Sequence, residues 1–410
     1  MDSVSTELPN GRIDGVCDPR FSAVAREFER NFRERGEAGA AVSLTLGGET
    51  LVDLWGGMAA EDRPWQRDTV CVVFSCTKGA TAICAHILAS RGLLDIEAPV
   101  AGYWPEFAAN GKENATVRMM LDHSVGVPTF HHALKQRAAL DWHYMCERLA
   151  AEEPFWKPGT RNGYHMVNFG WTVGELVRRV SGLSLGTFFA QNVAGPTAAE
   201  FWIGLPEEVE PRIASMIPYT RQKGEPLSAF ELAIVEDKKS IPALAMVNGG
   251  GWNPAEREAR AAEVGGGGGF SNGRGLAAIY APLACGGSLG GVRLVDGLTL
   301  SRMGQVSVST NEDATLMIPT KFALGFMKSM DNRRAPAGRR DSVILSAPAF
   351  GHVGAGGSIG FADPEAGMSF GYAMNRMGKG ILMNDRGQSL VDAAYRSLGY
   401  SSNESGVWAR

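Results

Sequence analysis

The stretch Val72-Val73-Phe74-Ser75-Cys76-Thr77-Lys78-Gly79 decides how the rest of this sequence is interpreted. The run from Val70 to Phe74 is typical of a buried strand, and the apolar spacing after Ser75 predicts a helix that stops at Gly92. Residues three apart share one face of a helix, so the Lys78 amine is expected within reach of the Ser75 hydroxyl. Unpaired N–H groups at a helix N-terminus suit a developing negative charge. The stretch therefore predicts an acyl-transfer centre with Ser75 as nucleophile.

A purely structural interpretation of the same residues is also open. A Ser-x-x-Lys string is expected about once by chance in a chain of this length. A serine that opens a helix is usually its N-cap, and a lysine one turn later is usually solvated. The catalytic interpretation therefore depends on other parts of the chain.

Charge and composition narrow the classes of protein to consider. The net charge is −4 with both signs dispersed, which argues against a nucleic-acid partner. The first 18 residues lack the basic and apolar regions of a signal peptide, and no apolar run could span a bilayer. We therefore expect a cytoplasmic protein with no membrane partner. Six cysteines without any Cys-x-x-Cys pair fit neither a disulfide scaffold nor a metal knuckle.

The pattern along the chain predicts an α/β (α+β) fold. Strands near the two ends of the chain are separated by tight loops, which implies antiparallel pairing, and the middle of the chain is mostly helical. The predicted helices are 21–35, 275–283 and 386–398, and the predicted strands are 40–46, 50–55, 322–328, 358–362 and 368–374. The expected architecture is an antiparallel β-sheet flanked by helices, plus an inserted, mostly helical lobe.

This pattern also predicts how the chain divides. Residues 1–20 form a polar leader, residues 21–94 and 310–410 form the domain built on the sheet, and residues 95–309 form the helical lobe. A cleft between two lobes is a natural place for an active site.

Two further stretches carry candidate chemistry. In 158–171 a Pro-Gly turn delivers Tyr164 to the start of a predicted helix, where a neighbouring ammonium would favour a proton-shuttling phenolate. In 350–358 glycines surround His352, which could donate a hydrogen bond to a substrate, and the Ala355 N–H could polarise a reacting oxygen. Taken singly, a structural tyrosine and a glycine-rich bend with a surface histidine are the simpler interpretations.

Two other features invite functional interpretations that we set aside. The five glycines at 265–269 lack the Gly-Lys-Ser/Thr ending of a phosphate-binding loop, so a permissive turn before a helix is expected. His123, His131, His132 and His143 lack the spacing of a metal-binding helix.

In this order, Ser-x-x-Lys, a tyrosine motif and a His-x-Gly before a strand resemble the serine β-lactamase and penicillin-recognising superfamily. The resemblance is strongest to the class C-like branch and the family VIII carboxylesterases. It is supported by residues 121–126, 268–271 and 356–365, and it is loose from 205 to 260. It implies a β-lactamase/DD-peptidase-like fold.

The resemblance also implies roles for individual residues. Ser75 would be the nucleophile, Lys78 the general base and Tyr164 the proton relay. The oxyanion hole would consist of the Ser75 and Ala355 backbone N–H groups, the latter following His352-Val353-Gly354. This chemistry requires no metal and no organic cofactor.

Two departures from the β-lactamase pattern indicate the substrate. Met166 stands where class C enzymes carry an asparagine that binds the substrate amide, and His352 stands where β-lactamases carry a cationic lysine. With Gly354, these residues are expected to contact the substrate. We therefore predict a carboxylesterase for short-chain esters with weak β-lactam hydrolysis. An amidase, peptidase or acyltransferase with the same residues is the alternative, followed by a catalytically silent binding protein.

Overall fold

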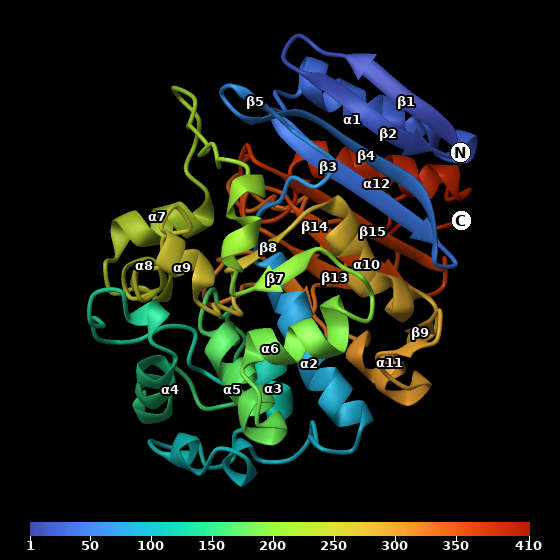
Figure 1. Ribbon diagram of the computed structural model, residues 1–410. Helices are drawn as coiled ribbons and strands as arrows, with labels where there is room; N and C mark the ends of the chain where they lie inside the picture. The colour runs from blue at the N-terminus through green and yellow to red at the C-terminus, as the bar shows by residue number, and fades with distance from the viewer.

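Strands from both ends of the chain form one antiparallel sheet, as expected from the sequence (Figure 1). The computed structural model describes all residues, 1–410. The sheet order is β1-β2-β4-β3-β15-β14-β13, and β5 pairs with β4. These strands are β1 Asp2–Glu7, β2 Arg12–Cys17, β3 Gly39–Leu46, β4 Glu49–Ala60, β5 Arg63–Pro64, β13 Phe350–Val353, β14 Ile359–Asp363 and β15 Met368–Met374. The central pair joins β3 to β15, with Leu44 opposite Phe370.

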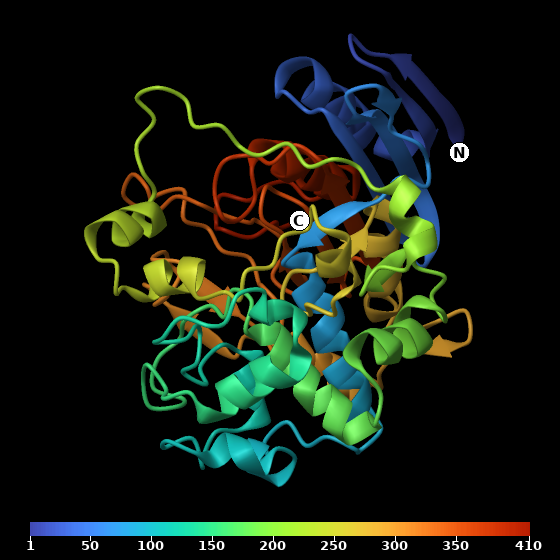
Figure 2. The same cartoon turned by 60° about the vertical axis from the view of Figure 1, so that its left-hand side comes forward.

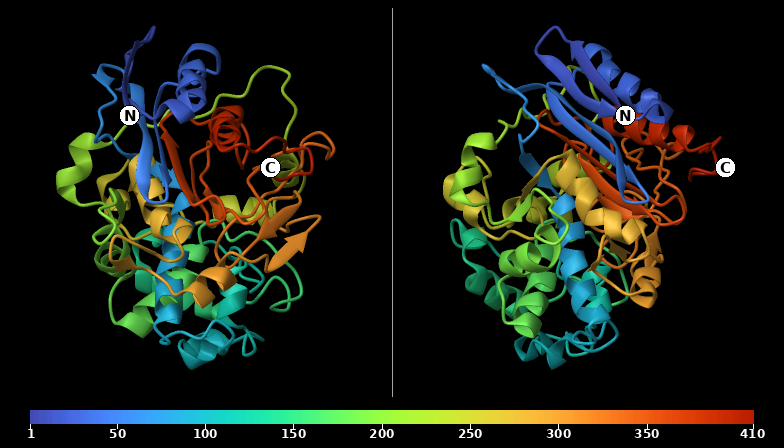
Figure 3. Two further views of the ribbon diagram at one scale, coloured as in Figure 1. Left: turned by 90° about the vertical axis from the view of Figure 1, so that its right-hand side faces the viewer. Right: turned by 45° about the vertical axis from the view of Figure 1, so that its right-hand side comes forward.

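Helices cover both faces of this sheet. Helices α1 (Ser22–Glu34) and α12 (Asp385–Ser397) lie side by side on one face, and α10 (Gly273–Ala284) packs on the other, against β3, β14 and β15 (Figure 3). Phe21, Val24 and Phe28 of the first helical segment are fully buried, which explains the apolar spacing seen in the sequence. The predicted α/β fold class is therefore confirmed.

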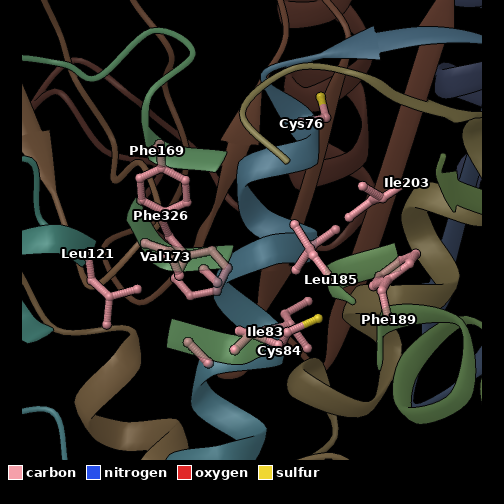
Figure 4. Close-up of a cluster of buried hydrophobic side chains, with 14 of the residues drawn as sticks. Cys76, Ile83, Cys84, Leu121, Phe169, Val173, Leu185, Phe189, Ile203 and Phe326 are labelled. Carbon is pink, nitrogen blue, oxygen red and sulfur yellow. The ribbon is translucent and has the colours of Figure 1, made fainter. Parts of the chain in front are cut away.

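The middle of the chain is mostly helical and surrounds α2 (Cys76–Ser90). Its other helices are α3 Val117–Leu121, α4 Trp142–Ala151, α5 Phe169–Ser181, α6 Leu185–Phe189, α7 Ala229–Glu236, α8 Ile241–Val247, α9 Arg257–Ala261 and α11 Gly297–Met303. Figure 4 shows α2 passing through an apolar cluster to which Ile83, Leu121 and Leu185 contribute. Helix α2 is buried along nearly its whole length, so its N-terminus is held rigidly.

Three small sheets complete the structure. One is the three-stranded sheet β6-β8-β7, whose strand β6 directly precedes α2 in the chain. The other two, β9–β10 and β11–β12, are two-stranded. Their strands are β6 Cys71–Phe74, β7 Phe201–Ile203, β8 Gly269–Ser271, β9 Ser288–Leu289, β10 Val292–Arg293, β11 Val308–Thr310 and β12 Thr320–Phe322. After β7, a long connection runs over the molecule to α7 and α8 (Figure 2). No helix is both long and apolar enough to cross a membrane.

The polar leader contains two strands that the sequence pattern did not indicate. Residues 1–17 form the β1–β2 hairpin, and β2 pairs with β4, so the leader extends the main sheet. Most of its residues are at least partly exposed, which hid the strand pattern in a polar sequence. The division into domains stays a prediction.

Candidate active site

Ser75 sits at the junction of strand β6 and helix α2. The preceding residue, Phe74, has a φ of +44°, a conformation that bulky residues adopt only when the surrounding structure enforces it. The Ser75 side chain caps no backbone N–H of α2, and Lys78 is 0% exposed. The structure therefore supports neither part of the structural interpretation, a capping serine and a solvated lysine.

The Lys78 amine has three oxygen neighbours. Its Nζ lies 3.1 Å from Ser75 Oγ and 2.6 Å from each of the backbone carbonyl oxygens of Met166 and Gly266. A neutral amine has two N–H groups and one lone pair. If the two carbonyls accept the two N–H groups, the lone pair faces Ser75 Oγ and can accept its proton.

The surroundings of Lys78 favour this neutral form. Burial holds the pKa of Lys78 well below its usual value, and no carboxylate pairs with the amine. The three imidazoles nearest to the site are neutral as well, because burial lowers the pKa of His165 and of His352 to about 3 and that of His123 well below its usual value. The site thus combines an uncharged base with three uncharged imidazoles.

Tyr164 lies beside this pair, although not on a helix. Helix α5 begins at Phe169, and Tyr164 belongs to the loop before it, which corrects the predicted helix start. Its ring centroid is 4.6 Å from Lys78 Nζ. Its hydroxyl lies near enough to the Ser75 side chain for Ser75 to lower its pKa, yet completes no hydrogen bond within the chain. Burial outweighs this effect and raises the pKa of Tyr164, so the resting side chain is a phenol and not the phenolate that the sequence suggested.

Strand β13 brings the third predicted stretch to the same place. A Cβ on Gly354 would lie 2.2 Å from the Val73 carbonyl oxygen, so only glycine allows this close approach. The Cys76 thiol donates to the His352 carbonyl oxygen at 3.3 Å, which ties β13 to the first turn of α2. Neither the Ser75 N–H nor the Ala355 N–H donates to an acceptor within the chain, and both residues are half-buried. The N–H groups of Ser75 itself and of Ala355 are thus both free to bind an oxyanion.

His352 differs from its predicted role in one respect. Its Nδ1 lies 2.7 Å from the Val353 carbonyl oxygen, so in the neutral ring Nδ1 carries the proton. Its Nε2 is then an acceptor, is buried, and has no partner within the chain. His352 Nε2 therefore cannot donate the predicted hydrogen bond to a substrate. That the His352 side chain contacts the substrate stays a prediction.

Several residues of the site have no side-chain signature in the sequence. Met166 and Gly266 contribute backbone carbonyls, which every residue has. Asn384, the N-cap of α12, donates from Nδ2 to the Gly356 carbonyl oxygen at 2.5 Å and so anchors the turn that follows Ala355. The glycine run at 265–269 is thus part of this site, because its Gly266 carbonyl binds Lys78. The run leads into β8, where the Gly269 N–H donates to Thr77 Oγ1 in the first turn of α2.

Comparison with known proteins gives the family. The sequence profile of the family described as Beta-lactamase matches residues 25–394. The chain belongs to this beta-lactamase family. It is 36% identical over 387 residues to "Esterase/beta-lactamase LipL" of Mycobacterium tuberculosis, covering 91% of this chain and 85% of that protein.

Solved structures agree with this assignment. A family VIII carboxylesterase superposes with a TM-score of 0.81 at 38% identity, over 94% of this chain and 99% of that one. A penicillin-binding protein homologue from Caulobacter crescentus gives a TM-score of 0.82 at 33% identity, with the same shares covered. The resemblance stated from the three motifs is confirmed.

Proposed function

We propose that this beta-lactamase family member is a serine carboxylesterase that acts through an acyl-Ser75 intermediate. The observation that carries the proposal is the Lys78 amine, whose two carbonyl partners leave its lone pair facing Ser75 Oγ. The names of the relatives support it, since two of them are described as an esterase and a carboxylesterase.

Acylation follows from the positions of these groups. Ser75 Oγ attacks the ester carbonyl carbon while its proton passes to Lys78 Nζ, and the oxyanion is held by the Ser75 and Ala355 N–H groups. Tyr164 gives its phenol proton to the leaving alkoxide and regains one from the Lys78 ammonium. The C–O bond to the alcohol breaks, and the acyl group stays on Ser75. A water molecule then attacks the acyl carbonyl carbon, and its proton passes through Tyr164 to Lys78. The bond between the carbonyl carbon and Ser75 Oγ breaks, Ser75 regains its proton from Lys78, and the carboxylic acid leaves.

We further propose that the substrates are neutral, short-chain esters, with weak β-lactam hydrolysis as a side activity. No ammonium stands at position 352 to attract a carboxylate, because the His352 ring is neutral. The relative described as both an esterase and a β-lactamase makes β-lactam hydrolysis the second candidate function. The cytoplasmic location and the lack of nucleic-acid and membrane partners stay predictions.

The test compares two neighbouring residues. Ser75→Ala should abolish hydrolysis of p-nitrophenyl butyrate, whereas Cys76→Ser should retain most of it, because burial raises the pKa of the Cys76 thiol and keeps it protonated. Circular dichroism and thermal unfolding would show that both variants are folded. Retained activity in Ser75→Ala would overturn the proposal. Turnover of nitrocefin beside the ester would decide between the two candidate functions.

A further inference from the structure

Asp313 is a fully buried carboxylate that forms no ion pair. It lies between β11 and β12 and is 149 residues from Tyr164 in the sequence. Its Oδ1 accepts the Tyr164 backbone N–H at 3.0 Å and those of Thr315 and Leu316 at 2.9 and 2.8 Å. Its Oδ2 accepts the same Tyr164 N–H at 3.1 Å and the Thr320 hydroxyl at 3.3 Å. A buried charge without a cation is costly, so these donors must compensate it.

The loop that carries Asp313 also holds the residues before Tyr164. The Ala314 N–H donates to the Asn162 carbonyl oxygen at 3.0 Å, and Thr320 Oγ1 lies 3.2 Å from Asn162 Oδ1. A Cβ on Gly163 would meet the Ala314 Cβ at 3.0 Å and the Trp156 ring at 2.6 Å. The loop that carries Asp313 is therefore in direct contact with the two residues before Tyr164.

The same unit supports the ring of Tyr164. Phe322, two residues after Thr320 in β12, stacks on Tyr164 with a centroid distance of 5.8 Å and an interplanar angle of 9°. His123 packs against it at 4.9 Å. Because the phenol oxygen makes no hydrogen bond within the chain, the position of that oxygen depends on how the backbone and ring are held.

We propose that Asp313 is a positioning residue that fixes Tyr164 for proton donation to the leaving alkoxide. This inference rests on the proposed esterase function. A carboxylate suits the task better than an amide, because its two oxygens accept three N–H groups and a hydroxyl, whereas an asparagine NH₂ would face donors. Burial raises the pKa of Asp313, and the hydrogen bonds from these donors oppose that shift and favour the charged carboxylate. Its negative charge adds to the effect of burial in raising the pKa of Tyr164 and so keeps the proton on the phenol.

The experiment uses the dependence on the leaving group. A good leaving group such as p-nitrophenolate needs little protonation, whereas ethoxide needs a proton from Tyr164. In the full-length chain, Asp313→Asn should lower kcat/KM for ethyl butyrate by about 100-fold and for p-nitrophenyl butyrate by about tenfold at most. Tyr164→Phe should likewise lower kcat/KM more for ethyl butyrate than for p-nitrophenyl butyrate. The double variant Asp313→Asn/Tyr164→Phe should have a kcat/KM for ethyl butyrate only slightly below that of Tyr164→Phe alone.

A matched control separates positioning from simple destabilisation. Asp363 is also 0% exposed, and its carboxylate accepts from Ser346 Oγ and from the Tyr395 hydroxyl, away from Ser75. Asp363→Asn should lower the unfolding temperature while leaving the ratio of the two kcat/KM values unchanged. If Asp313→Asn fails to fold, Thr320→Val removes one donor to Asp313 and should give the same selectivity on a smaller scale.

The outcomes are distinct. The positioning role would be overturned if Asp313→Asn and Thr320→Val lowered kcat/KM by the same factor for both esters. If Ser75→Ala were inactive in the same experiment, the esterase function would still stand. An active Ser75→Ala would instead overturn the proposed function.

Discussion

Two buried lysines of this protein are held in nearly the same way, but only one has a hydroxyl beside it. Lys78 donates to two backbone carbonyls and faces Ser75 Oγ. Lys112, which is 1% exposed, donates to the carbonyls of Ala109 and Glu152, lies 5.1 Å from the Phe107 ring centroid, and has no further hydrogen-bond partner. Burial lowers the pKa of both amines. The comparison teaches that burial and a lowered pKa do not in themselves make a lysine a base, because the lone pair of the amine must also face a proton.

The largest expected effect tests this difference directly. Lys78→Met should lower kcat for p-nitrophenyl butyrate by about three orders of magnitude, because no other group in reach can accept the Ser75 proton. Lys112→Met should leave kcat within about twofold of the wild type. Steady-state kinetics of the two variants, measured side by side, would test this difference. Similar losses of kcat in both variants would show that the two lysines do not differ in the way the structure indicates.

The second prediction concerns pH. Lys78 acts only when neutral, so kcat/KM should fall as the pH drops through its lowered pKa and should be flat above it. A lysine with an ordinary pKa would give activity that still rises at about pH 10. A pH profile measured with a neutral ester, whose own charge does not change, distinguishes the two. A profile still rising at that pH would show that Lys78 is charged at rest.

The third prediction concerns the stability contributed by the hydrogen bonds of Lys112. Lys112→Met leaves two carbonyl oxygens without their donor, so the free energy of unfolding should fall by about 1–3 kcal/mol. Urea denaturation at pH 7 would measure it. An unchanged midpoint would mean that water replaces the amine at these carbonyls.

The fourth prediction sharpens the comparison further. The pKa of Lys112 is lowered to about 8, whereas a lysine in the unfolded chain titrates near 10.4. Between these values the unfolded chain binds a proton that the folded chain does not, so the stability of the wild type rises with pH. Lys112→Met lacks this contribution. The difference in unfolding free energy between wild type and variant should therefore grow from pH 8 to pH 10.

Much of this fold and site could be predicted from the sequence, and the exceptions have physical reasons. Helices α1 and α12 follow from apolar periodicity, since each buries one side, whereas β3 and α10 could be recognised although they are buried along nearly their whole length. The β1–β2 hairpin was missed because an edge hairpin that is half-solvated needs no apolar face. The helix predicted at Tyr164 starts at Phe169 instead, because the backbone before it is bound to Asp313 and His123.

The site, too, contains residues that could be predicted from the sequence and residues that could not. Ser75, Lys78, Tyr164 and Ala355 could be named from motifs, and the structure brings them together. The carbonyls of Met166 and Gly266 could not, because a backbone acceptor leaves no trace in the residue type. Asp313 could not either, since only the folded chain brings it to Tyr164.

The pairing of β3 with β15 has a consequence for the order of events during synthesis. Ser75 and Lys78 leave the ribosome well before Ala355, β14 and β15, which lie more than 270 residues further along the chain. Until then the nascent chain has a nucleophile with only one of its two oxyanion donors, and β3 presents an open edge that can pair with other chains. The chemistry therefore becomes available only after Ala355 and the last strands of the sheet have been made. A premature stop after residue 349 would yield an inactive polypeptide with an exposed strand edge.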